Sequence, residues 1–213
     1  MATILKKKAL VVVAHCDDAI LWMGGIIHHL RDWEWHIFSM CNNHNEQKIQ
    51  SFNKSCEMLL TTKFQALSFL DYSDGLDFSQ NKKENMKSEL CQKIDDNYDY
   101  IFTHGTQEWN EYSRHPNHQE TGIIVSEIAT ERKIPLLQFC YYPIYGSGTA
   151  TVAYKERAHY YFQLNYEELK FKLSLINCFP QEMPNLIPLA YPCPNPECFE
   201  STITDLIPPF IKK

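Results

Sequence analysis

One imidazole and two carboxylates lie close together near the start of the chain, in the segment Ala14-His15-Cys16-Asp17-Asp18. Zinc binds histidine nitrogen and carboxylate oxygen, and a catalytic zinc site uses three protein ligands and leaves a position for water. His15 and one of the two aspartates are therefore candidate metal ligands, and the other aspartate is a candidate base that takes a proton from water. The alternative is that Asp17 or Asp18 caps the next helix by accepting its free N–H groups.

A second polar cluster, Arg114-His115-Pro116-Asn117-His118-Gln119-Glu120, opens a predicted helix. Its two histidines are three residues apart at the helix start, so they can converge on one point. One can bind a metal while the other donates a hydrogen bond to a reacting oxygen. The alternative is a pair of surface histidines, and the metal site closes only if this cluster lies beside the first one.

The strands and helices expected along the chain predict that the two polar clusters lie close together. Residues 9–14 form an apolar, valine-rich run that is typical of a buried parallel strand, and the next helix carries Gly24-Gly25, which allow close packing. Further strands are expected at 35–41, 64–70, 98–104 and 135–142, and helices at 20–30, 46–60, 85–94, 119–132 and 166–178. This alternation predicts a Rossmann-like α/β fold: an open, mostly parallel sheet with helices on both faces.

Ligands of such sheets bind outside the carboxyl ends of the strands. His15 follows the first strand and His104 ends the fourth, so both reach this edge. His44 follows the second strand, and Trp109 and Glu111 precede the second histidine cluster. An aromatic ring there can stack on a sugar and a carboxylate can hold hydroxyl groups; ordinary loop packing is the alternative for all three.

The chain is expected to be a single domain, with a core at about 9–142 and an extension at about 143–213. The last 34 residues hold eight of the eleven prolines, which predicts an extended wrap over the core. Cys193 and Cys198 resemble half of a structural zinc site, but no second pair is near, so a loop is expected there.

Composition excludes several classes of protein. With 44% hydrophobic and 22% charged residues the chain is globular, and its net charge of −6 argues against a nucleic-acid partner and for a small-molecule ligand. No apolar run approaches the roughly 18–20 residues of a membrane span. The eight scattered cysteines are typical of free thiols in the reducing cytoplasm. The number of subunits stays open, and a homo-oligomer is possible.

The two clusters resemble the signatures of the LmbE-like family, which includes the PIG-L N-acetylglucosaminyl-phosphatidylinositol deacetylases and the mycothiol-pathway deacetylase. That family carries Ala-His-Pro-Asp-Asp-Glu after its first strand and His-Pro-Asp-His later. This chain has Ala14-His15-Cys16-Asp17-Asp18-Ala19 and His115-Pro116-Asn117-His118. Gly24-Gly25, the segment 69–75 and Thr103-His104-Gly105 are further similarities, and order and spacing agree over roughly 9–142.

The resemblance implies a zinc-dependent N-deacetylase that hydrolyses the N-acetyl group of an amino sugar or sugar conjugate, releasing acetate and a free amine. It implies one zinc ion per chain, bound by His15, Asp18 and His118. It further implies that Asp17 is the general base and that His115 is the partner of the oxyanion.

Three residues depart from the signatures: Cys16 replaces proline, Ala19 replaces glutamate and Asn117 replaces aspartate. An amide at 117 keeps a hydrogen bond to an active-site histidine but removes the charge, so a slower or differently pH-tuned enzyme is expected. We expect the thiol of Cys16 to point away from the metal.

Two alternatives remain. One is a deformylase or amidase acting on another biosynthetic intermediate, which release of formate rather than acetate would reveal. The other is a catalytically degenerate module that binds a metal or a partner, for which Ala19 and Asn117 are the best support. The lack of a membrane segment favours a soluble substrate, such as a free or nucleotide-linked amino sugar.

Overall fold

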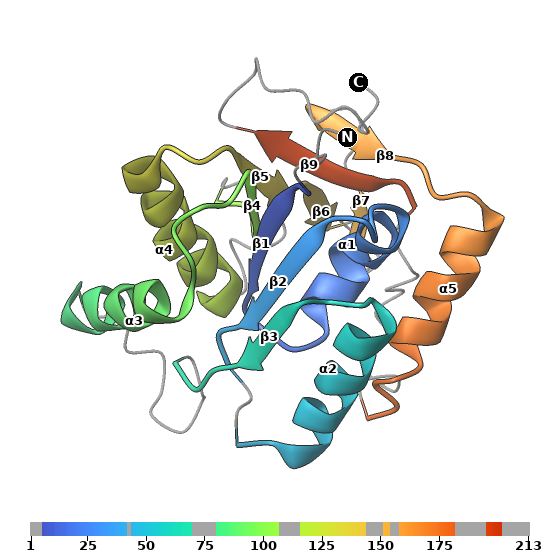
Figure 1. Cartoon of the computed structure of the whole chain (residues 1–213), viewed down its shortest axis with the longest axis horizontal. Coiled ribbons are helices and arrows are strands. Elements are labelled where there is room, and N and C mark those ends of the chain that lie inside the picture. Colours follow the sequence, from blue (N-terminus) through green and yellow to red (C-terminus); the bar gives the residue numbers. More distant parts are fainter. Residues whose placement is uncertain are drawn as a thin grey trace, which may run out of the picture.

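The structure is a computed structural model that describes residues 6–41, 44–69, 80–106, 116–143, 151–153, 158–181 and 195–201. Figure 1 shows a central sheet flanked by helices. The strands are β1 (Lys8–Val13), β2 (Glu34–Ser39), β3 (Lys63–Ala66), β4 (Tyr100–Thr103), β5 (Leu136–Phe139), β6 (Tyr141–Pro143), β7 (Thr151–Ala153), β8 (Tyr160–Phe162) and β9 (Glu197–Ser201). The helices are α1 (Asp18–His29), α2 (Glu46–Met58), α3 (Gln80–Lys93), α4 (Pro116–Arg132) and α5 (Tyr166–Ile176). None of these helices has the length and hydropathy needed to cross a membrane.

The main sheet has seven strands in the order β3-β2-β1-β4-β5-β9-β8. Its first five strands run parallel, whereas β9 is antiparallel to β5 and β8 is antiparallel to β9. Strands β6 and β7 pair with each other in a separate small sheet. The predicted open, mostly parallel α/β sheet is therefore confirmed.

Successive residues of β1 face opposite sides of the sheet, and each side is covered by helices. Ala9, Val11 and Val13 pack into a core shared with α1, α2 and α5, while Leu10 and Val12 pack into a second core shared with α3 and α4. All five side chains are completely buried. This explains why the sequence of β1 is apolar throughout instead of alternating.

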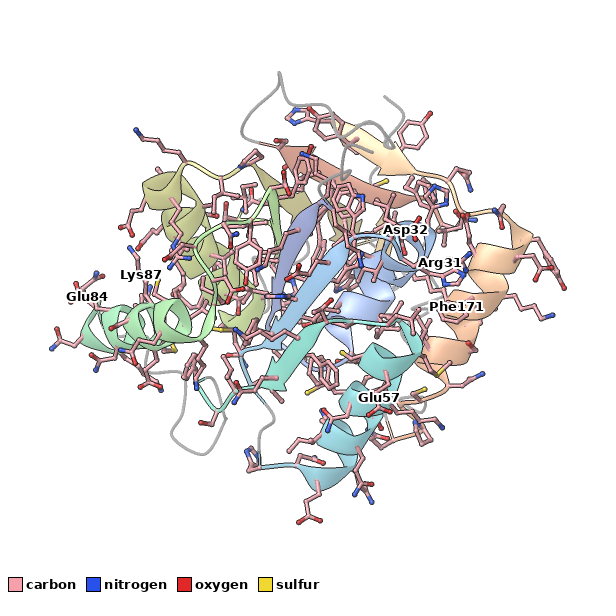
Figure 2. The ribbon with its side chains drawn as sticks, in the orientation of Figure 1. Arg31, Asp32, Glu57, Glu84, Lys87 and Phe171 are labelled. Atoms are coloured by element: carbon pink, nitrogen blue, oxygen red, sulfur yellow. The ribbon has the colours of Figure 1, made fainter. Side chains whose placement is uncertain are left out.

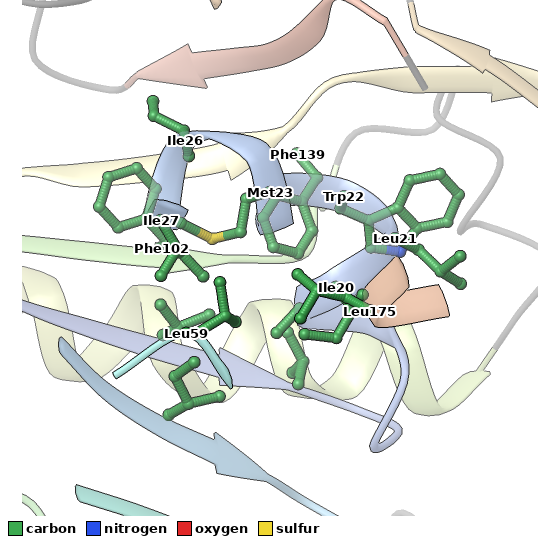
Figure 3. Packing of buried hydrophobic residues seen from close by; sticks show 14 of the residues in the cluster. Ile20, Leu21, Trp22, Met23, Ile26, Ile27, Leu59, Phe102, Phe139 and Leu175 are labelled. Atoms are coloured by element: carbon green, nitrogen blue, oxygen red, sulfur yellow. The ribbon is translucent and has the colours of Figure 1, made fainter. Parts of the chain in front are cut away.

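Helix α1 lies deepest in the first core, where Figure 3 shows its side chains gathered with Phe102 and Phe139 of the sheet and Leu175 of α5. A Cβ atom at Gly25 would lie 2.1 Å from Leu164 Cδ2, so only glycine permits this approach and the expected close packing is found there. At the end of α1, the His28 ring stacks on Phe171 of α5, labelled in Figure 2, with ring centroids 3.8 Å apart.

The C-terminal region differs from the expectation in one respect. Glu197–Ser201 forms β9 inside the sheet, so the prediction of a loop is wrong for Cys198, which is a fully buried strand residue. The charged Glu197 at the start of this strand can be buried because its carboxylate is paired inside the fold with Lys172 at 2.6 Å. Residues 182–194 and 202–213, which hold most of the predicted wrap, lie outside the described residues.

Candidate active site

The two polar clusters meet at the carboxyl ends of β1 and β4, which are neighbouring parallel strands. His15 follows β1 by two residues, Asp18 is the first residue of α1, and His118 lies in the first turn of α4. The crossover of the chain brings all three to one edge of the sheet, as expected for an open α/β fold. Asp18 and His118 are buried, and the side chain of His15 is 14% exposed.

Three atoms of these side chains form a small triangle. His15 Nδ1 lies 2.8 Å from His118 Nε2 and 3.2 Å from Asp18 Oδ2, and the third edge, from His118 Nε2 to Asp18 Oδ2, is 3.4 Å. Two ligand atoms on one tetrahedral zinc ion, each about 2.05 Å from it, would lie about 3.3 Å apart. The donor types and their spacing therefore fit one divalent ion.

The electrostatic environment keeps the carboxylate of this triangle ionised. Burial would raise the pKa of the Asp18 carboxyl, but the neighbouring imidazoles, that of His118 first, hold that pKa well below its usual value. Burial would likewise lower the pKa of the His15 imidazole, but the Asp18 carboxylate outweighs burial and raises it well above its usual value. The triangle thus pairs a carboxylate with a positively charged imidazole, and a metal ion that binds there takes the place of the imidazole proton.

The other aspartate of the first cluster has a different position. Asp17 occupies the N-cap position of α1, yet its side chain accepts no hydrogen bond from the helix. Asp18 also fails to cap, because its Oδ2 accepts the N–H of His15, outside the helix, at 2.7 Å. The capping interpretation is therefore wrong for both residues. The half-buried Asp17 borders a small hollow lined in part by Ile20 and Phe179.

The departures from the family signatures are buried. The Cys16 thiol donates to the Cys41 carbonyl at 3.8 Å and is not part of the ligand triangle, in agreement with the expectation that it points away. Ala19 is fully enclosed in the first core, where a glutamate would be expensive to bury. Asn117 is 1% exposed, next to His118.

Other predicted site residues are not brought into this cluster. His44 is exposed in the turn before α2 and does not belong to the triangle. His115, Trp109 and Glu111 lie outside the described residues, so their predicted roles stay predictions.

Sequence reasoning missed the role of one residue. His104, directly after β4, is completely buried, and its ring stacks on that of His118 with centroids 4.2 Å apart. Its position at the end of a strand was a usable signal, but a single histidine in an apolar strand gives no spacing from which a partner could be read.

A second cluster that could hold an ion, formed by Glu34, His36 and Asp95, is found among the described residues. Lys8 Nζ lies 2.5 Å from Asp95 and 3.2 Å from Glu34, and Lys63 Nζ lies 3.2 Å from Asp95. These ammonium groups already neutralise both carboxylates. We therefore interpret this cluster as a surface ion-pair network and not as a metal site.

Proteins of known structure that share the fold include a deacetylase and a hydratase. The protein TT1542 from Thermus thermophilus is 16% identical, with a TM-score of 0.66 over 96% of this chain and 99% of that one. The N,N'-diacetylchitobiose deacetylase from Pyrococcus horikoshii is 18% identical, with a TM-score of 0.60 over 96% and 87%. The 4-carboxy-2-hydroxymuconate hydratase GalB from Pseudomonas putida KT2440 is 13% identical, with a TM-score of 0.60 over 94% and 98%. At these identities the likeness shows the fold alone.

None of the curated proteins matches the chain. The family described as PIG-L, GlcNAc-PI de-N-acetylase, matches residues 10–129, which include most of β1, the triangle of His15, Asp18 and His118, and most of α4. The chain belongs to the PIG-L family of de-N-acetylases.

Proposed function

We propose that the protein is a zinc-dependent N-deacetylase that hydrolyses the N-acetyl group of an amino sugar or sugar conjugate and releases acetate and a free amine. The observation that carries this proposal is the triangle of His15 Nδ1, Asp18 Oδ2 and His118 Nε2, with edges of 2.8 to 3.4 Å. Asp17, the residue before Asp18, carries a carboxylate that does not cap the helix.

The ligand set of two imidazoles and one carboxylate suits one zinc ion per chain, because zinc accepts nitrogen and oxygen ligands and keeps one position open in catalytic sites. When bound there, zinc would polarise the amide carbonyl and lower the pKa of water, to about 7 in typical catalytic sites. His15, Asp18 and His118 would hold it.

The remaining roles are assigned to Asp17 and His115, which stand next to the proposed ligands in the sequence. Asp17 accepts a proton from the attacking water and can return it to the leaving amine. His115, which precedes α4 by one residue, donates a hydrogen bond to the oxyanion of the tetrahedral intermediate and is a second candidate for proton delivery. Asn117 supplies an amide where the family signature has a carboxylate, so we expect its neighbouring imidazole to be charged less readily.

The substrate class is inferred from the family description, a de-N-acetylase of an N-acetylglucosamine conjugate, and from the deacetylases that share the fold. A small molecule with an N-acetylated amino sugar, with or without a linked nucleotide, is the substrate we propose. Formyl or other acyl groups are the first alternative, and a non-catalytic metal-binding module is the second. Because the hydratase GalB shares the fold, hydration is a further reaction that an assay must exclude.

The test starts with the metal. Protein purified without added metal should contain about one zinc ion per chain, and His118→Ala, which removes one of the three proposed ligands, should contain little. His28→Ala serves as the control, because His28 is stacked on Phe171 away from the triangle and its loss should leave the metal content unchanged.

A panel of N-acetylated and N-formylated amino sugars then distinguishes the reactions by the acid released. Acetate release that depends on zinc supports the proposal, and formate release supports the first alternative. No metal in the wild type, even after zinc is supplied, would overturn the proposal in favour of a degenerate module.

A further inference from the structure

His104 contacts every segment that carries a proposed ligand, although the proposed chemistry gives it no task. The backbone N–H of Ala14, next to His15, donates to His104 Nε2 at 2.9 Å. The same nitrogen lies 3.3 Å from Asp18 Oδ2. The ring stacks on His118 with an interplanar angle of 18°.

The backbone around this imidazole is fixed on two further sides. The Gln138 side chain donates to the His104 carbonyl at 3.3 Å. A Cβ atom at Gly122 would lie only 2.7 Å from the same oxygen, so α4 approaches the end of β4 as closely as a glycine permits. The Phe139 ring packs edge-to-face against the His104 imidazole, with ring centroids 5.3 Å apart. His104 is therefore held in one orientation and can act as a reference point for its neighbours.

The hydrogen bond from Ala14 also determines the role of Nε2. A ring nitrogen that accepts an N–H carries no proton, so the proton of the neutral imidazole is on Nδ1. In this form Nε2 gives no hydrogen to Asp18 Oδ2, which already accepts the N–H of His15 at 2.7 Å. A further lone pair of that oxygen is left for a cation, while the ring behind it limits where the oxygen can move.

We propose that His104 is a positioning residue that sets the geometry of the metal ligands His15, Asp18 and His118. It does so by accepting the Ala14 N–H, by stacking on the His118 ring and by lying against the Asp18 carboxylate. This inference rests on the proposed metal site. Groups that orient metal ligands typically change metal affinity by about 10–100-fold when they are replaced.

The test measures the affinity of the full chain for Co²⁺ by competition with a chelator, together with the visible absorption of the Co²⁺ complex. His104→Phe keeps a ring to stack on His118 but cannot accept the Ala14 N–H. We expect its dissociation constant to rise by about 10–100-fold and its Co²⁺ spectrum to change. In His104→Gln the amide oxygen can take the place of Nε2, so we expect it to recover at least half of the lost affinity on a logarithmic scale.

The matched control is His36→Phe, because His36 is also a buried histidine of the sheet, hydrogen-bonded through Nδ1 to the Tyr98 hydroxyl at 2.9 Å, but belongs to the ion-pair network. It should lower the melting temperature and leave Co²⁺ binding unchanged. If His104→Phe does not fold, His104→Asn replaces it, since its shorter amide does not reach the Ala14 N–H.

Wild-type affinity in a folded His104→Phe variant would overturn the inference, as would an equal loss in His36→Phe. Absence of Co²⁺ and Zn²⁺ binding in the wild type would overturn the proposed function, and the positioning role with it. If the wild type binds metal, the two proposals can be tested separately. The difference in Co²⁺ affinity between the wild type and the His104 variants then tests the positioning role alone.

Discussion

The ammonium of Lys172 donates to the Glu197 carboxylate across 2.6 Å, and both side chains are fully buried. The same carboxylate accepts the N–H groups of Gly25 and Ile26 at 2.9 and 2.8 Å. These groups are available because α1 leaves helical geometry at Met23, where φ is −148° and ψ is 16°. The Glu197 carboxylate of β9 therefore links α5 to the interrupted helix α1, which begins at the candidate site.

Lys172→Met should be strongly destabilising, because it leaves the buried Glu197 carboxylate without the cation that neutralises it. Breaking a buried pair in this way costs about 3–5 kcal/mol. Combining Lys172→Met with Glu197→Gln removes both charges and should recover part of that loss. Urea denaturation measures each free energy of unfolding. Lys170→Met, at an exposed position of the same helix, is the control, and a Lys172→Met variant as stable as this control would contradict the prediction.

The two adjacent glycines of α1 provide a matched pair. A Cβ atom at Gly25 would lie 2.1 Å from Leu164 Cδ2, whereas at Gly24 the nearest atom, Leu175 Cδ1, is 3.4 Å away. Gly25→Ala should therefore lower the free energy of unfolding by about 1–3 kcal/mol through overpacking. Gly24→Ala should leave it unchanged or raise it by up to about 1 kcal/mol, since alanine favours helix over glycine. Chemical denaturation of both variants checks the difference, and equal effects would refute it.

The parallel part of the fold could be predicted from the sequence because its signals are local. Residues 9–14 are apolar throughout, as a strand buried on both faces must be, and β1 occupies nearly the same residues. Strand β9 gave no such signal. Its first residue is the charged Glu197, and burial of that charge is acceptable because of groups that are distant in the sequence: the Lys172 ammonium and two backbone N–H groups of α1.

In the candidate site, too, one part could be predicted from the sequence and another could not. His15 and Asp18 are three residues apart, and the strand–helix pattern places His118 at the same sheet edge, so their meeting could be predicted. The role of His104 could not, because it depends on an N–H from Ala14 and on a ring stack with His118, both of which exist only once β1 and β4 pair. Tertiary contacts of this kind leave no periodic pattern in a single sequence.

Asp95 should contribute to the pH dependence of stability. The Lys8 ammonium, hydrogen-bonded at 2.5 Å, and that of Lys63 lower the pKa of this carboxyl to about 2. This value lies below the pKa of roughly 3.9 of an aspartate in the unfolded chain. The ionised carboxylate therefore stabilises the folded state fully above about pH 3.9, and this stabilisation is lost as the pH falls toward about 2. The Asp95 side chain is 37% exposed, so the effect should be small and weakened by salt.

Thermal melting of wild type and Asp95→Asn at a series of pH values checks this sign. The wild type should melt higher near pH 6, and the difference should shrink as the pH approaches about 2. Asp96→Asn is the control, because that side chain is 95% exposed beside Arg132. A difference that grows toward acid would show that another group is responsible.

Asp17→Asn should separate metal binding from turnover. The new amide would keep the size of the side chain but could not accept a proton from water at neutral pH, and loss of a general base typically costs about 10²–10⁴-fold in rate. The triangle of His15, Asp18 and His118 does not include residue 17, so metal content should stay at the wild-type level. Acetate release and metal content are measured on the same preparation, with the exposed Asp32→Asn as control. Unchanged turnover would exclude Asp17 as the base. Loss of the metal would show instead that Asp17 helps to hold the ion, either as a ligand or by positioning one, because the fall in rate would then follow from the missing metal and not from a missing proton acceptor.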